Sequence, residues 1–232
     1  MDDFTPERKQ FAIVLAGTFN PLMFQPEWFG RYGVISQEEV ESSRNQSNAQ
    51  PTIITPQLSF FRTSQLNVSV DEARFQVQAE KEPFLLVKDF VKNTFERLGG
   101  LTLSAYGFNY SAHYKFRGEA ELNAFADRLA PKQYWRTLLG KDVSGDNRTG
   151  GLIAIHMSQA KEQADGLINV QLQRSVLTFP GVFIHCNDHT DAKKDRSSAD
   201  DVIEELDKRF ESSLAFLLKI QNDLLTEATK ND

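Results

Sequence analysis

The segment AYGFNYSAHYKF, residues 105–116, constrains the fold more than any other stretch of the chain. Apolar or aromatic residues alternate there with small or polar ones, from Tyr106 and Gly107 through to Lys115 and Phe116. Successive side chains of a β-strand point to opposite sides of the sheet, so a period of two this long predicts a strand with one dry face and one wet face. The chain therefore has to build a sheet that is covered on one side only.

The rest of the chain supplies partners for this strand. Apolar or alternating runs bounded by turn residues predict strands at 9–19, 58–63, 66–70, 73–80, 152–160, 166–177 and 181–188. Helical spacing predicts helices at 83–100, 119–130, 132–140 and 198–229, short helical turns at 22–33 and 36–44, and polar loops at 43–51 and 142–151.

Hairpin signals such as Ala164-Asp165-Gly166 favour antiparallel neighbours. We therefore expect a single α+β domain over residues 1–232, in two layers. Its sheet is antiparallel or mixed, with helices on one face and a long C-terminal helix at about 198–229. The order of the elements also hints at two related halves.

The same alternation in the later strands defines the uncovered side of the sheet, which we call the open face. Its residues are mainly amides, hydroxyls and imidazoles, and few are charged, with Lys115 the main exception. Such a face can bond to another polar surface without desolvating full charges. It is a ligand site, a contact between sheets or a merely solvated surface. The predicted members are Asn109, Ser111, His113, His156, Ser158, Asn169, Gln171, Gln173, His185 and Asn187, with His189 on the same side. The candidate binding residues are Asn109, His113, His156, Gln171, His185 and Asn187.

The segment GVFIHCNDHTD raises the question of a metal site. In a strand, His185 and His189 lie ~13 Å apart, because each residue rises ~3.3 Å. They cannot both reach one zinc ion at ~2.0–2.1 Å. His189 and Asp191 could chelate an ion if the strand continues, with His113 or His156 as a third ligand. Two ligands make a weak site, so we predict no metal.

No motif in the chain specifies a reaction. The patterns GxSxG, HExxH and CxxC are absent, and the glycine-rich segment 145–151 lacks the Gly-Lys-Ser/Thr ending of a phosphate loop. Cys186, the only cysteine, shares the dry side with Val182 and Ile184 and is expected in the core. We predict no catalytic residue and no cofactor.

The charge and hydropathy of the chain limit the kinds of partner that it can bind. The net charge of −6 and the pI near 5.3 disfavour binding to duplex nucleic acid, which needs clustered cations. The acidic start of the chain does not resemble a signal peptide, and no apolar run approaches the ~20 residues of a membrane span. We expect a cytoplasmic protein with no membrane partner.

The C-terminal helix carries a broad apolar stripe. Its positions recur at helical spacing from Ile203 to Leu224 and widen at Phe216, Leu218 and Leu225. A wide stripe predicts a helix covered on more than one side. One side would pack on the sheet, and the other could pair with a second copy of the chain.

Three segments carry a family resemblance. These segments are similar to features of a sporadically distributed family of uncharacterised bacterial proteins. They are the strand leading into FNPLMFQPEWFG, the strand GFNYSAHYKF, and VFIHCNDH followed by ELDKRFESSLAFLLKI. The resemblance implies a bacterial cytoplasmic protein, and its patchy distribution fits accessory or defence roles. It implies no reaction, cofactor or catalytic residue.

Two functions follow as expectations. The first is a non-enzymatic binding or assembly protein that self-associates as a homodimer, or binds another protein, through the long helix or the open face. The alternative is an enzyme or small-molecule binder with a pocket over the open face that uses His113, His156 or His185.

Overall fold

The computed structural model describes residues 4–44, 51–98, 100–132, 135, 151–162 and 164–229. The helix predicted at 132–140 and the polar loops predicted at 43–51 and 142–151 lie mostly outside these residues.

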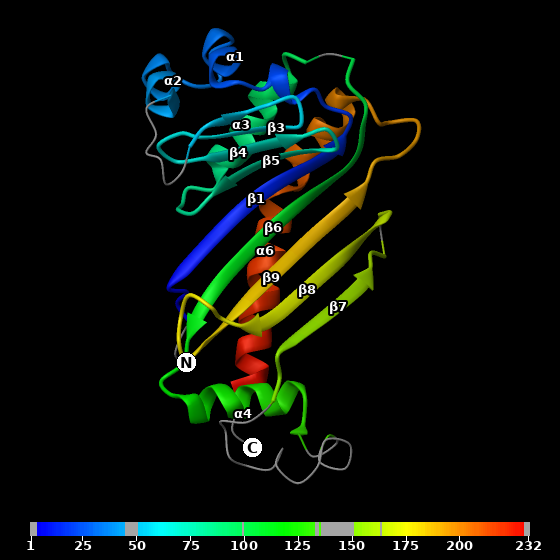
Figure 1. The fold of residues 1–232 in the computed structure, drawn as a ribbon. Helices are drawn as coiled ribbons and strands as arrows, with labels where there is room; N and C mark the ends of the chain where they lie inside the picture. The colour runs from blue at the N-terminus through cyan, green and yellow to red at the C-terminus, as the bar shows by residue number, and fades with distance from the viewer. Residues whose placement is uncertain are drawn as a thin grey trace.

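The core of the molecule is a nine-stranded sheet (Figure 1). Its order is β2-β3-β4-β5-β1-β6-β9-β8-β7, and every pairing within the described residues is antiparallel. The α+β prediction is confirmed, and β2 is a short edge strand that the sequence patterns missed. The strands are β1 Arg8–Gly17, β2 Ile53–Ile54, β3 Leu58–Arg62, β4 Asn67–Asp71, β5 Arg74–Ala79, β6 Leu103–Lys115, β7 Ala154–Ala160, β8 Gly166–Arg174 and β9 Gly181–Asp191.

Helices cover one side of this sheet. The long helix α6 runs behind β6 and β9, and α3 lies beside it, where it packs on strands β1 and β5 (Figure 1). No helix in the described part of the chain has both the length and the apolar character needed to cross a membrane. The helices are η1 Pro21–Met23 (a single 3₁₀ turn), α1 Pro26–Arg31, α2 Gln37–Arg44, α3 Leu85–Phe95, α4 Glu119–Leu129 and α6 Ala199–Thr229.

Most of the broad apolar stripe of α6 is covered within one chain, although Phe216 remains 43% exposed. Leu206, Phe210 and Leu217 are buried against the sheet, and α3 and α4 pack alongside the same helix. The second covered side that the sequence indicated is therefore provided by α3 and α4 and does not require a second copy. Gln221, predicted within the stripe, is fully buried and donates to the carbonyl oxygens of Tyr110 at 3.2 Å and Ile184 at 3.1 Å.

The sheet consists of two topologically equivalent halves, as the order of elements hinted. In the first half, β1 is followed by helices, by the meander β3-β4-β5 and by α3; in the second, β6 is followed by α4, by β7-β8-β9 and by α6. The last strand of each meander pairs with the first strand of its half, and β1 and β6 join the halves at the centre. The strand orders β3-β4-β5-β1 and β7-β8-β9-β6 therefore mirror each other across the sheet.

The predicted alternation is confirmed in the central strands. The five predicted dry residues of β6, and Phe116 directly after the strand, are at most 3% exposed. Cys186 is fully buried among them, as predicted, and burial raises the pKa of its thiol to about 11. The aromatic residues near the N-terminus also pack into the core, because Phe24 and Phe29 are buried.

The alternation holds in β7, but the burial expected from it does not. Alternation with His156 and Ser158 places Ile153, Ile155 and Met157 on the side that the helices cover, yet Ile153, directly before the strand, is 82% exposed and Met157 is 65% exposed. These side chains are exposed because α6 contacts β6 and β9, whereas β7 lies two strands further out in the sheet.

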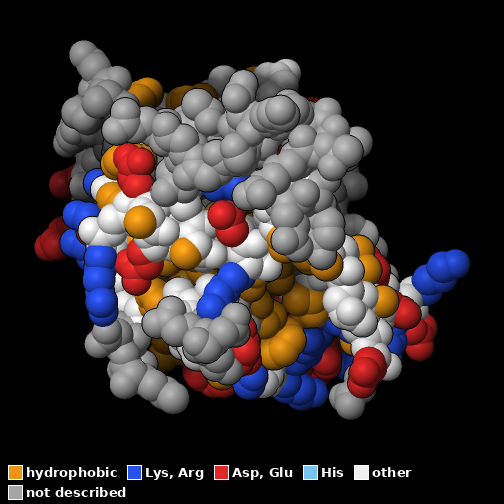
Figure 2. Space-filling view, turned by 90° about the horizontal axis from the view of Figure 1, so that it is seen from below, with side chains coloured by type: hydrophobic (Ala, Val, Ile, Leu, Met, Phe, Trp, Pro, Cys, Tyr) orange, Lys and Arg blue, Asp and Glu red, His pale blue; other side chains and the backbone are white. Residues whose placement is uncertain are grey.

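The turn between β8 and β9 exposes further apolar side chains. Val176, Leu177 and Phe179 are 87%, 57% and 66% exposed. Viewed from below, the molecule shows hydrophobic side chains between charged ones (Figure 2).

Candidate functional site: the open face of the sheet

The register of the strands brings the predicted binding residues onto one face. Residues directly opposite each other in a sheet project to the same side. Asn109 lies opposite Asn187 and Ser111 opposite His185, which in turn lies opposite Gln171. His156 continues this row on β7, and His113 lies opposite Phe183 one row away. The open face is therefore continuous from β6 to β7, and none of the six residues is beneath α6.

A chain of hydrogen bonds crosses four strands of this face. The Ser158 hydroxyl donates to Asn169 Oδ1 at 2.8 Å. Asn169 Nδ2 donates to Asn187 Oδ1 at 3.0 Å, and Asn187 Nδ2 donates to Asn109 Oδ1 at 3.0 Å. We call Ser158, Asn169, Asn187 and Asn109 the carboxamide row. Every donor points the same way, so neighbouring bonds polarise each other.

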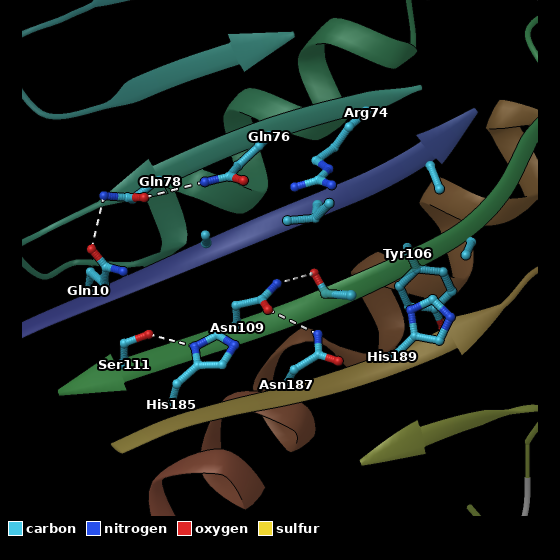
Figure 3. A pocket seen from close by; sticks show the side chains of 15 residues that line it. Gln10, Arg74, Gln76, Gln78, Tyr106, Asn109, Ser111, His185, Asn187 and His189 are labelled. Carbon is cyan, nitrogen blue, oxygen red and sulfur yellow. Dashed lines mark hydrogen bonds between the residues drawn. The ribbon is translucent and has the colours of Figure 1, made fainter. Parts of the chain in front are cut away.

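A shallow hollow of about 270 Å³ lies beside the end of this row, over β1 and β6 (Figure 3). Small residues of the central strands line it, including Ala12, Ala16 and Gly107. Gly107 has a direct steric role, because a Cβ there would lie 3.0 Å from Asn187 Nδ2. The hollow exists because short side chains at the centre are flanked by long polar ones.

The residues that line the hollow on the side of the first half of the sheet were not predicted from the sequence. Gln78 Nε2 donates to Gln10 Oε1 at 3.1 Å, Gln76 Nε2 reaches Gln78 Oε1 at 3.4 Å, and Arg74 lies at the end of the same strand (Figure 3). The signal was present, since Gln76 and Gln78 alternate with the buried Phe75 and Val77. This alternation in β5 places Gln76 and Gln78 on the open face, as the same pattern does for the later strands.

Three of the four histidines line one or both of two hollows on the open face. His185 and His189 line the first, and His185 and His156 line a second, of about 280 Å³, over β7 and β8. His113 lines neither, and its Nδ1 lies 2.8 Å from the hydroxyl of Ser175. The structure therefore brings His156 and His185 together in one row and one hollow, whereas His113 lies one row away and lines neither hollow.

Burial keeps two of the imidazoles neutral. Desolvation lowers the pKa of His185, and desolvation together with the nearby Arg8 lowers the pKa of His113. His185 Nδ1 lies 2.7 Å from the Ser111 hydroxyl. Because both rings are uncharged at neutral pH, they add hydrogen-bond donors and acceptors to the face without adding charge.

The Ser111–His185 pair does not have the geometry of an activated nucleophile. Ser111 is only 3% exposed, and among the described residues no carboxylate bonds to the His185 ring. Activation of a serine requires an accessible hydroxyl and a base that is oriented by a third group. The pair is better explained as a cross-strand contact that orients the imidazole.

The geometry in the GVFIHCNDHTD segment agrees with the expected separation of its histidines. β9 continues through Asp191, and His189 Nε2 lies 3.1 Å from Asp191 Oδ1. Within the residues that the structure describes, no three His, Cys, Asp or Glu side chains form a group suited to a metal ion.

A buried ionic cluster lies on the opposite side of the sheet. Lys161 forms an ion pair with Asp188, and these side chains are only 8% and 3% exposed. Arg209 of α6 reaches the second oxygen of Asp188 at 3.4 Å and Thr190 Oγ1 at 2.7 Å. The ionic cluster, Lys161, Asp188, Thr190 and Arg209, connects the β7–β8 hairpin and β9 to the long helix. Sequence reasoning missed it, although Asp188 and Thr190 continue the dry alternation of Ile184 and Cys186.

Neither a search against models of protein families nor one against curated proteins finds a match for this chain. The resemblance to a sporadically distributed bacterial family therefore stays a prediction, and the function has to be argued from the open face itself.

Proposed function

We propose that this chain is a non-enzymatic binding protein of the bacterial cytoplasm whose open face binds an extended polypeptide segment of a partner protein. The carboxamide row carries the proposal. A side-chain carboxamide presents the same N–H donor and carbonyl acceptor as a peptide bond, so a row of them complements a stretch of backbone.

The row retains bonding capacity after its internal bonds are made. A carboxamide can form about four hydrogen bonds. Within the described residues, Asn187 and Asn169 each use one donor and one acceptor in the row. Gln171, which donates to Gln173 Oε1 at 2.9 Å, lies in the next row and adds further groups of the same kind.

The electrostatics of the face suit a polypeptide better than a nucleic acid. His113 and His185 are neutral because burial lowers their pKa values, and the chain as a whole is acidic with a net charge of −6. Phe183 offers an apolar contact at one end, with its ring centroid 4.8 Å from that of His113. A neutral polar surface with one aromatic residue supports recognition of backbone amides plus a single side chain.

A displayed library of random peptides provides the test, with NMR of the side-chain amide groups as the readout. Selected peptides are expected to shift the NH₂ resonances of Asn109, Asn169 and Asn187. Asn187→Ala should weaken their binding about tenfold, a difference of ~1.4 kcal/mol. The control is Asn222→Ala, which removes an exposed carboxamide from α6 and should leave the affinity unchanged. Equal affinities for both variants, or shifts confined to other surfaces, would contradict the proposal.

The hollow supports a second candidate, a small-molecule binder. Its volume of about 270 Å³ and the convergence of Arg74, Gln78 and His189 suit a small polar ligand. Val14→Phe would fill this hollow while leaving the carboxamide row in place. If a screened ligand loses binding in that variant while the selected peptides do not, two sites exist; if the peptides alone bind, the second candidate is wrong.

A further inference from the structure

Strand β7 is the outermost strand on the second-half side of the sheet. Among the described residues, β8 is the only strand that pairs with it. A natural edge strand is usually protected by charged side chains, proline, a bulge or extreme shortness, because its outward N–H and C=O groups can template another strand. The opposite edge, β2, is two residues long.

β7 has none of these protections. Its sequence, AIHMSQA, spans seven residues and contains no Lys, Arg, Asp, Glu or Pro. All of its residues are exposed except Ile155, which is half-buried. Met157 at its midpoint leaves an apolar side chain 65% exposed.

The hydrogen bonds at the hairpin determine which groups of β7 face outward. Lys161 N–H donates to Gly166 O at 3.1 Å, so Lys161 bonds toward β8. In an antiparallel ladder the bonded residues alternate. Met157 and Gln159 therefore direct their backbone groups toward β8, while His156 and Ser158 direct theirs away from the sheet.

We propose that β7 pairs antiparallel with β7 of a second copy, on a twofold axis through Met157. This register overlaps the whole strand and places His156 opposite Ser158 of the other copy. These residues carry outward backbone groups in both chains, so the pairing satisfies about eight hydrogen bonds in all. The inference does not depend on the proposed function of the open face.

The strand is self-complementary in this register. A directly opposite His–Ser pair already exists within the sheet, at a non-hydrogen-bonded position of the ladder, where the Ser111 hydroxyl lies 2.7 Å from His185 Nδ1. On the other side of the sheet, the exposed Met157 side chain meets its symmetry mate. Alanines occupy both ends, since Ala154 lies opposite Ala160 of the other copy.

Analytical ultracentrifugation of the full chain at high micromolar concentration is the first test, with a dimer expected. Ser158→Pro removes an outward N–H while leaving the bonds to β8, and it should abolish the dimer. Met157→Glu places two like charges opposite each other and should raise the dissociation constant about tenfold or more. The matched control is Ile53→Glu, which adds the same charge at the opposite edge at a side chain 38% exposed, and it should have no effect.

Cysteine cross-linking tests the register. Met157→Cys places two thiols opposite each other, at a Cα separation of about 4.5–5.5 Å that a disulfide can span. Gln159→Cys is the control, since its two copies would lie ~13 Å apart. Native Cys186 is fully buried and should not react. A monomer at all concentrations, a dimer disrupted by Ile53→Glu but not by Ser158→Pro, or cross-linking through Gln159→Cys would overturn the proposal.

Discussion

The two halves of the sheet share a topology but are held together by different chemistry. In the first half, the meander and its helices are joined by phenylalanines, with Phe29 within 5.3 Å of Phe61 and 5.0 Å of Phe90, measured between ring centroids. In the second half, the corresponding meander adds the ionic cluster around Asp188 to its apolar contacts with α6. The strand order therefore does not dictate how the core beneath it is stabilised.

The two halves also differ in how far the equivalent outer strands β3 and β7 are buried. The inner side of β3 is fully covered, with Phe61 buried and the hydroxyl of Ser59 donating to the Phe24 carbonyl. The equivalent strand β7 is exposed along its length. One half is thus closed by its own helices, whereas the other presents an outer strand and a polar face. Among the described strands, β7 is therefore more exposed than its counterpart β3.

The largest expected effect tests this difference in core packing. Phe61→Ala should reduce the free energy of unfolding by about 3–5 kcal/mol, because it leaves a cavity in a fully buried site. Met157→Ala, in the equivalent strand, should cost less than about 0.5 kcal/mol in dilute solution, since its side chain is mostly exposed. Urea denaturation provides the measurement. Similar losses of unfolding free energy for the two variants would show that β3 and β7 do not differ in how they are packed.

A smaller effect is expected from the ionic cluster. Lys161→Met leaves Asp188 with Arg209 at 3.4 Å and removes the buried ammonium group, which should cost about 2 kcal/mol of unfolding free energy. The control is Lys208→Ala, which breaks an exposed pair with Glu204 and should cost about 0.5 kcal/mol or less. If the two variants unfold at the same urea concentration, the cluster does not hold the second half to α6.

The smallest expected effect is a pH dependence of the unfolding free energy. It arises in the second half, which contains all four histidines. Burial lowers the pKa of His185 below 6.5, the value for an exposed ring. Between the folded and unfolded pKa values the unfolded chain binds more protons, so stability is complete above about pH 6.5 and declines as the pH falls below it.

The variant His185→Gln should make this decline shallower between about pH 7.5 and about pH 5.5, as followed by urea midpoints. His113 should preserve part of the decline, because its pKa is lowered too. His156→Gln, at an exposed ring, is the control. A slope in His185→Gln identical to that of the unaltered chain would contradict the assignment to His185.

The sequence predicted the fold better than it predicted the site. Alternation in β6 and β9 was enough to infer a sheet with one open face, because side-chain direction in a strand depends only on local geometry. It could not reveal that β7 lies beyond the reach of α6, since strand order is a long-range property. The same limit applies to Gln10, Gln76 and Gln78, which meet Asn109 across the hollow only because β1 pairs with both β5 and β6.

The hydrogen bonds of the carboxamide row all run in the same direction across the sheet. Its donors all point from β7 toward β6, and a carboxamide reverses its bonding only by turning over. Because each oxygen accepts from the preceding group, Asn109 cannot turn over without Asn187 and Asn169 following. The orientation of Asn109 at the centre of the sheet is therefore tied to that of the Ser158 hydroxyl at its edge, three strands and about 14 Å away by ordinary strand spacing.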